Sequence, residues 1–330
     1  MGAILKIRDN DIGRPVAMKV ILEPDDSERV ERFVEEAQIT GQLEHPNIVP
    51  VHEIGVTPDG RAYFTMKLVK GRSLESIVQG ISSGDASTRG LYPLAALLRI
   101  FTKVCDAVAF AHSCGVIHRD LKPENVMVGE FGEVQVMDWG LAKVIARRGR
   151  QAAEPVEAFR KIEVGPPAGP MPDGPGARPG LERADGAGGR TEINPGKDTV
   201  RTIRSHDDGI RTLDGAIMGT PSYMSPEQAD GRLDEIDERS DVFALGGILY
   251  TLLVHEPLYT GATAMNMVTK AARAEFVPLS ERAKGARVPP ELESVCMKAL
   301  QLDKADRYSS VADFSADIQA YLDHRLVRAH

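Results

Sequence analysis

The sequence predicts an α+β protein of two lobes, a small β-rich lobe that carries one helix and a larger, mainly α-helical lobe. Before position 70, short β-branched runs are separated by turn residues, as in a small sheet. After position 74, apolar residues recur at helical spacing in several long segments. A chain of 330 residues with 42% hydrophobic residues is long enough to build both lobes.

The small lobe should contain four strands and one helix. Val30, Phe33 and Ala37 recur at helical spacing, which predicts a helix over Ser27–Leu43. The strands are expected on either side of it, at Ile4–Arg8, Pro15–Leu22, Ile48–Val56 and Ala62–Val69.

The large lobe should contain five long helices, each with an apolar stripe: Leu94–Ser113, Asp241–Val254, Ala262–Ala274, Pro290–Leu300 and Val311–Arg325. The longest apolar stretch, Val242–Val254, is too short to cross a bilayer and is interpreted as a buried helix. No membrane segment is therefore expected in this chain.

Charge and cysteine content narrow the function classes. A formal net charge of -8 and a pI near 5.6 give no general attraction to nucleic acid or anionic membranes, so no nucleic-acid partner is expected. Cys105, Cys114 and Cys296 are widely spaced and form no zinc-binding pattern. The start shows no signal peptide. We expect a cytoplasmic protein, although a longer parent could be membrane-anchored.

One segment has the composition of a disordered chain. Gly165–Arg190 holds 14 glycines and prolines in 26 residues, with no aromatic side chain and no periodicity. Such a segment buries too little apolar surface to offset the entropy lost on ordering. We therefore predict a disordered insertion over residues 147–198.

The chemistry is concentrated in the string HRDLKPEN at positions 118–125, followed by DWG at 138–140. Phosphoryl transfer needs an in-line hydroxyl and neutralised phosphate charge. Asp120 can orient the hydroxyl and accept its proton, and Lys122 can lie beside the moving phosphoryl group. Asn125 and Asp138 offer hard oxygen ligands for magnesium. A polar loop between a helix and a hairpin is the alternative interpretation.

Every position of the string 118–125 matches the catalytic loop of protein kinases, and the chain resembles the bacterial branch of eukaryotic-like serine/threonine kinases. The resemblance implies the bilobal kinase-like fold and covers nearly all of the chain outside the insertion. Lys122 and the Pro-Glu after it are typical of the serine/threonine form. Trp139 replaces the usual phenylalanine and Ser225 the usual alanine, changes that keep a plausible shape.

In the small lobe the resemblance implies a site for ATP. The string VAMK at 16–19 resembles the strand that presents the ATP-binding Lys19, with Ala17 against the adenine. Glu36 matches the helix glutamate that pairs with this lysine, and Glu35 is a competing candidate by one position. A lone lysine on a strand, or a lone glutamate on a helix, is more often a solvated surface charge.

The same resemblance supplies further adenine contacts. Met66 aligns with the gatekeeper position, the backbone of Lys67 and Val69 would meet the adenine, and Met127 would close the pocket from below. An ordinary core role is equally compatible with these side chains.

The string GTPSYMSPE at 219–227 resembles the substrate-docking loop of serine/threonine kinases. Thr220 would bridge Asp120 and Lys122, and Glu227 would form a buried ion pair with Arg307. Asp241 would anchor the backbone of the catalytic loop, or simply cap the helix that it begins.

The resemblance divides the chain into an N-lobe (1–70), a first part of the C-lobe with the catalytic loop (71–146), the insertion (147–198) and the rest (199–330).

A kinase normally opens with a glycine-rich loop, and Met1-Gly2 resembles only its tail. Either translation begins inside that loop, or the sequence is a fragment or has a wrongly assigned start. We favour the second interpretation.

The resemblance also implies cofactors, partners and regulation. The chain should use ATP with Mg²⁺, or Mn²⁺ in its place, to phosphorylate serine and threonine hydroxyls of proteins. Self-association would permit trans-autophosphorylation, with Thr212 as the first site and Thr199 and Thr202 as further sites, and Arg119 would pair with the phosphate. A pseudokinase scaffold and a small-molecule phosphotransferase are the alternatives, and the docking loop disfavours the latter.

Overall fold

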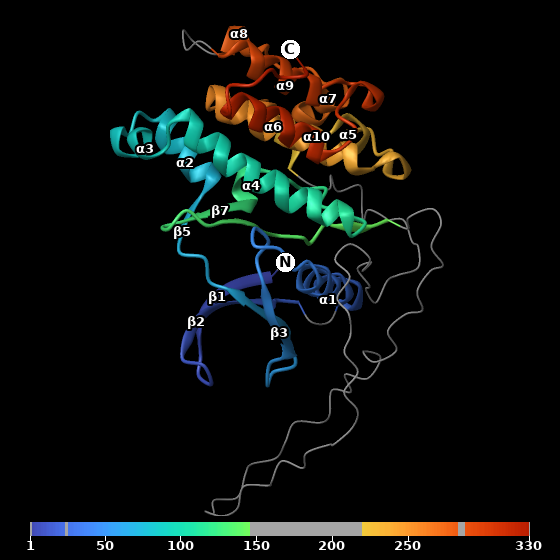
Figure 1. The fold of residues 1–330 in the computed structure, drawn as a ribbon. Helices are drawn as coiled ribbons and strands as arrows, with labels where there is room; N and C mark the ends of the chain where they lie inside the picture. The colour runs from blue at the N-terminus through green and yellow to red at the C-terminus, as the bar shows by residue number, and fades with distance from the viewer. Residues whose placement is uncertain (1, 24–25, 146–219, 283–287, 330) are drawn as a thin grey trace, which may run out of the picture.

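The computed structural model describes residues 2–23, 26–145, 220–282 and 288–329. Its N-terminal part is a four-stranded antiparallel sheet of order β1-β2-β4-β3 with one helix beside it (Figure 1). These elements are β1 (Gly2–Asp9), β2 (Arg14–Ile21), α1 (Ser27–Gln42), β3 (Val51–Val56) and β4 (Ala62–Lys67). The expected small lobe of strands and one helix is confirmed.

Helix α1 packs on the sheet through a small apolar core. The rings of Phe33 on α1 and Phe64 on β4 lie 5.1 Å apart between centroids. Ala17 on β2 and Met66 on β4 face each other in the register and are both buried in this core. Asp26 caps the start of α1 by accepting a hydrogen bond from the backbone N–H of Arg29 at 3.1 Å.

The C-terminal part is mainly helical and carries small sheets on the side that faces the N-terminal sheet (Figure 1). Its helices are α2 (Leu74–Ser82), α3 (Ala86–Leu91), α4 (Leu94–Ser113), α5 (Pro226–Ala229), α6 (Glu238–Val254), α7 (Ala264–Ala272), α8 (Leu279–Arg282), α9 (Pro290–Ala299) and α10 (Val311–Leu322). Its strands are β5 (Gly71–Ser73), β6 (Val116–Ile117), β7 (Val126–Gly129), β8 (Val134–Val136) and β9 (Lys143–Val144). The single-turn 3₁₀ helices are η1 (Pro123–Asn125), η4 (Pro221–Tyr223), η5 (Leu233–Glu235) and η6 (Lys304–Asp306).

Helix α6 runs through the middle of this lobe and is buried from Ser240 to Leu253. Its two consecutive glycines permit close packing on two sides. A Cβ at Gly246 would lie 2.9 Å from Cβ of Ala299 on α9, and a Cβ at Gly247 would lie 3.2 Å from Cδ1 of Tyr223 in η4. Helix α6 therefore contacts both the C-terminal helices and the segment that contains Tyr223.

Several element boundaries differ from the sequence-based prediction. The strand expected from Ile48 begins at Val51, because Pro50 has no N–H to donate to a ladder. The helix expected from Asp241 begins at Glu238, and Asp237 is its cap. The helix expected to reach Arg325 ends at Leu322, since His324 adopts a left-handed φ of 56°. Helices α2 and α3 were not predicted.

Candidate active site

The side chains predicted to meet the reacting hydroxyl lie together in the loop between β6 and η1. The carboxylate of Asp120 accepts a hydrogen bond from Nζ of Lys122 at 2.7 Å and one from the backbone N–H of Thr220 at 3.0 Å. Nζ of Lys122 also donates to Oγ1 of Thr220 at 2.5 Å. Thr220 thus joins the catalytic loop to a segment 100 residues further along the chain.

The backbone of this loop is fixed by one buried carboxylate on α6. Asp241 accepts hydrogen bonds from the backbone N–H groups of His118 at 2.8 Å and Arg119 at 2.9 Å, and its Oδ2 lies 2.8 Å from Nε2 of His112. Burial alone would raise the pKa of Asp241, but His112, His118 and these hydrogen bonds hold it below its usual value. Asp241 therefore contacts the backbone of this loop, and the side chain of Asp237 accepts the capping hydrogen bond of α6 from Arg239.

Arg119 adopts an uncommon backbone conformation inside this loop. Its φ is 67°, a left-handed value that costs a non-glycine residue roughly 1–2 kcal/mol. Its Nε donates to the carbonyl of Leu141 at 2.5 Å. Burial lowers the pKa of Arg119 to about 10, so the guanidinium remains charged at neutral pH.

Asn125 and Asp138 are the expected metal ligands. Nδ2 of Asn125 donates to the carbonyl of Asp120 at 2.9 Å, so the amide oxygen is its available metal ligand. The side chain of Asp138 is 50% exposed, and its Oδ1 lies 3.4 Å from Nζ of Lys19. Within the described residues, no group of three His, Cys, Asp or Glu side chains could hold a metal alone. The pair fits Mg²⁺, which takes one or two protein ligands and completes its shell with phosphates and water.

Lys19 on β2 pairs with Glu36 on α1, and the Nζ to Oε1 distance is 2.5 Å. The pair therefore uses Glu36 and not its neighbour Glu35. Burial alone would lower the pKa of Lys19, but the charges of Glu36 and Asp138 outweigh this and raise it. A Cβ at Gly140 would lie 3.1 Å from Oε2 of Glu36, so this glycine lets the 138–140 segment approach α1 closely.

The residues expected around adenine lie at the junction of the two parts. Ala17 is buried on β2 opposite Met66 on β4, and Met127 is half-buried on β7, opposite Ser73. The backbone N–H of Lys67 already donates to the carbonyl of Pro50 at 3.1 Å, so this N–H is not available to a base. Val69 follows, half-buried, in the connection to β5.

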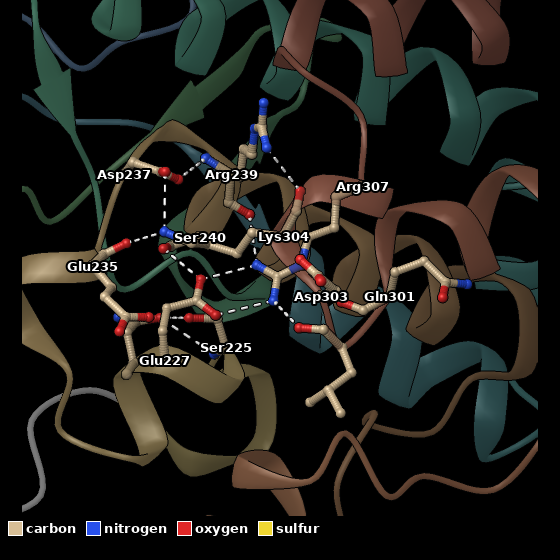
Figure 2. A network of polar contacts seen from close by, with 12 residues as sticks. Ser225, Glu227, Glu235, Asp237, Arg239, Ser240, Gln301, Asp303, Lys304 and Arg307 are labelled. Carbon is tan, nitrogen blue, oxygen red and sulfur yellow. Dashed lines mark hydrogen bonds and ion pairs between the residues drawn. The ribbon is translucent and has the colours of Figure 1, made fainter.

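Glu227 on α5 and Arg307 form a buried bidentate ion pair, with both N to O distances at 2.9 Å (Figure 2). The other three guanidinium donors meet the carbonyls of Gln301, Arg239 and Leu302. Oγ of Ser240 donates to Glu227 at 2.6 Å. All five guanidinium donors are thereby used, which is the condition under which a buried pair of charges is tolerated.

Acid should weaken this pair. Burial alone would raise the pKa of Glu227, but the hydrogen bonds and charge of Arg307 hold it below the usual value. The stabilisation is therefore present above the unfolded pKa of about 4.3 and is lost as the pH falls through the folded pKa. We expect the unfolding free energy of the wild type to fall more steeply below about pH 4.3 than that of Glu227→Gln, measured by urea denaturation. Parallel curves would contradict this assignment.

Sequence reasoning missed three polar residues of this region: His112, Ser240 and Gln228. Gln228 carried a readable signal, because Ser225 at the N-cap followed by Gln three positions later is the pattern of a capping box. His112 and Ser240 reach their partners only through the fold, and no local pattern marks them.

Some predicted sites lie outside the described residues. They are the predicted phosphorylation sites Thr199, Thr202 and Thr212, and the predicted insertion at 147–198 also lies there. Trp139 is described: its buried ring lies 4.5 Å from that of His118. In the part of the chain that the structure describes, no helix is both long and apolar enough to span a bilayer.

Comparison with known proteins gives the family. Residues 1–159 match the model of the protein kinase domain family. The chain is 32% identical over 327 residues to the serine/threonine-protein kinase PknD of Protochlamydia amoebophila. The aligned region covers 98% of this chain and 27% of that relative. It is 32% identical over 332 residues to PknD of Chlamydia trachomatis serovar D and 31% identical over 328 residues to that of Chlamydia muridarum, each covering 98% of this chain and 30% of the relative. The chain thus spans less than a third of the length of these curated relatives. These matches confirm the resemblance to the protein kinase family, in the bacterial branch of eukaryotic-like serine/threonine kinases.

Proposed function

We propose that this chain transfers the γ-phosphate of ATP to serine and threonine hydroxyls of proteins. The observation that carries the proposal is the contact of the Asp120 carboxylate with both Lys122 and Thr220. This carboxylate is held beside a segment that resembles a protein-docking loop, and it is within reach of a hydroxyl presented there.

The proposed mechanism assigns one task to each residue. Asp120 orients the substrate hydroxyl and accepts its proton, while Lys122 stabilises charge on the transferring group. Lys19, held by Glu36, binds the α- and β-phosphates. Asn125 and Asp138 would hold a divalent ion, Mg²⁺ or alternatively Mn²⁺, which when bound neutralises charge on the β- and γ-phosphates.

The proposed adenine site is formed by the residues at the junction of the two parts: Ala17, Met127 and the backbone of Lys67 and Val69. We propose that Thr220, Glu227, Asp241 and Arg307 shape the active site without contacting the nucleotide. The division of the chain into an N-lobe, two parts of the C-lobe and an insertion, with boundaries at residues 70, 146 and 198, also stays a prediction.

The setting of the reaction is proposed from the same features. Serine- and threonine-containing proteins are the substrates, self-association serves autophosphorylation, and nucleic acid is not a partner. Cys105 and Cys296 are buried free thiols. Free thiols fit a reducing compartment, so we propose that the reaction takes place in the cytoplasm.

A direct test uses the 330-residue chain with radiolabelled ATP, Mg²⁺ and a generic basic protein substrate. We expect labelled phosphoserine and phosphothreonine after acid hydrolysis, and at least about 100-fold less label with Asp120→Asn. Absence of transfer to any protein hydroxyl, or label confined to a small-molecule acceptor, would contradict the proposal.

Autophosphorylation should occur between Thr199 and Thr212, with Thr212 first. A phosphate carries about -1.5 to -2 charges and can form one to three charge-assisted hydrogen bonds with an arginine, which we propose is Arg119. Thr212→Ala should therefore lower activity, and the loss should be partial because Asp214, two positions later in the sequence, still supplies a carboxylate. Mass spectrometry after incubation with ATP and Mg²⁺ locates the phosphate. An active kinase without phosphate in this range would show that the switch is absent.

A further inference from the structure

The side chain of Gln228 on α5 makes hydrogen bonds in two directions, one through each end of its amide. Its Oε1 accepts from the backbone N–H of Ser225 at 3.2 Å and from Oγ of Ser225 at 2.9 Å, which closes the capping box of α5. Its Nε2 donates to the carbonyl of Arg119 at 2.8 Å, 109 residues away in sequence. The amide oxygen therefore serves α5, and the amide nitrogen serves the catalytic loop.

The carbonyl of Arg119 belongs to the peptide unit that leads into Asp120. A peptide unit is planar, so fixing its C=O and N–H fixes the direction in which the next residue departs. The N–H of this unit is the amide of Asp120, which donates to Nδ1 of His118 at 3.3 Å. Gln228 and His118 thus hold the two ends of one plane, immediately before the proposed catalytic carboxylate.

This plane needs support because Arg119 has a left-handed φ of 67°. Such conformations persist only where the surroundings impose them. Asp241 holds the backbone N–H of Arg119, and the carbonyl of Leu141 holds its side chain. Asp241 acts on the preceding peptide unit, whereas Gln228 acts on the unit that joins Arg119 to Asp120.

We propose that Gln228 is a positioning residue, which couples the fold of the docking segment, residues 220–229, to the direction of Asp120 through the carbonyl of Arg119. When α5 is formed, the capping box orients the amide and its nitrogen locks the plane of the Arg119–Asp120 peptide. When α5 is displaced, that lock is lost. The inference rests on the proposed function for its effect on turnover, but its structural part does not.

Because the two contacts use different ends of the amide, mutations can remove the contact with Arg119 and the capping box separately. Gln228→Glu keeps an oxygen for Ser225, so the capping box survives and a negative charge at a helix start is favourable. The same substitution removes the N–H donor to the carbonyl of Arg119 and places a carboxylate oxygen against that carbonyl oxygen. Ser225→Ala does the reverse, because it removes the capping hydroxyl and leaves the Gln228 nitrogen. Gln301→Glu is the matched control, since its side chain is exposed and its amide donates to the carbonyl of Met297 at 3.1 Å, away from the catalytic loop.

Steady-state kinetics and thermal melting test the proposal. For Gln228→Glu we expect kcat to fall about 10- to 100-fold, the loss typical of a catalytic group displaced by about 1 Å. We expect its KM for ATP and its melting temperature to stay near those of the wild type. Ser225→Ala should show the opposite balance, with a lower melting temperature and a smaller loss of kcat. Gln301→Glu should match the wild type. A kcat for Gln228→Glu equal to that of Gln301→Glu would overturn the proposal.

Hydrogen–deuterium exchange tests the structural part without any turnover. The backbone amide of Asp120 should exchange faster in Gln228→Glu than in the wild type, and Gln301→Glu should leave it unchanged. Equal exchange in all three proteins would overturn the inference. If the wild type transfers no phosphate, the proposed function fails, and this measurement still decides whether Gln228 holds the peptide plane.

Discussion

Asp120→Asn should lower kcat by about 10² to 10⁴-fold, the range for loss of a general base. Asparagine has nearly the same shape and can still accept the backbone N–H of Thr220. It cannot take a proton from a hydroxyl, and it removes the charge partner of Lys122. The expected defect is therefore chemical, while the affinity for ATP should remain nearly unchanged because Asp120 has no proposed contact with the nucleotide.

Two measurements separate these effects: initial rates at saturating ATP, and calorimetric titration with ATP and Mg²⁺. Asp323→Asn is the matched control, because Asp323 lies at the exposed end of α10, where it pairs with Arg325. It should leave both quantities unchanged. Near wild-type turnover in Asp120→Asn would refute the proposed mechanism, and an equal loss in the control would point to general damage.

Glu227→Gln should lower the unfolding free energy by about 3–5 kcal/mol, the usual cost of leaving one member of a buried ion pair without its partner. The guanidinium of Arg307 would then face an amide that offers one acceptor where the carboxylate offered two. Both side chains are nearly inaccessible to solvent, with exposed fractions of 0% for Arg307 and 2% for Glu227. Water therefore cannot replace the lost contact.

Urea denaturation gives this quantity, with Glu275→Gln as the matched control. Glu275 and Arg273 form an exposed pair at 3.6 Å, for which a loss of no more than about 1 kcal/mol is expected. In addition, the double variant Glu227→Leu/Arg307→Met should lose less than the sum of the two single variants, because it buries no unpaired charge. A loss in Glu227→Gln as small as in the control would mean that water or another group compensates Arg307.

Much of the fold could be predicted, because its long helices carry strong periodic patterns. Helix α4 was predicted with its observed bounds. Helix α2 was missed although its signal was present, since its four buried residues recur at helical spacing: Leu74, Ile77, Val78 and Ile81. Helix α3 has six residues, one of them Gly90, and so gives a weak local signal. A contact with another element stabilises it, because Arg72 on β5 donates a hydrogen bond to Oγ1 of Thr88 at 2.8 Å.

The active-site residues could be placed from sequence wherever they share a short string. Asp120, Lys122 and Asn125 lie within six positions, so one loop brings them together. The choice between Glu35 and Glu36 depended on which side of α1 faces Lys19, and adjacent helix positions point about 100° apart. The role of Gln228 depended on a partner 109 residues away, which no local pattern reveals.

The glycine pair in α6 has a consequence for natural variation in this domain. Gly246 lies against α9, so any side chain there would clash with Ala299 and lower the stability of the folded protein. Gly247 lies against the buried side chains of Tyr223 and Leu258, so a side chain there would displace η4, the 3₁₀ helix that directly follows Thr220. Substitutions at these two adjacent glycines should therefore act on different neighbours, at Gly246 on the packing of α9 and at Gly247 on the segment that holds Thr220 against Asp120.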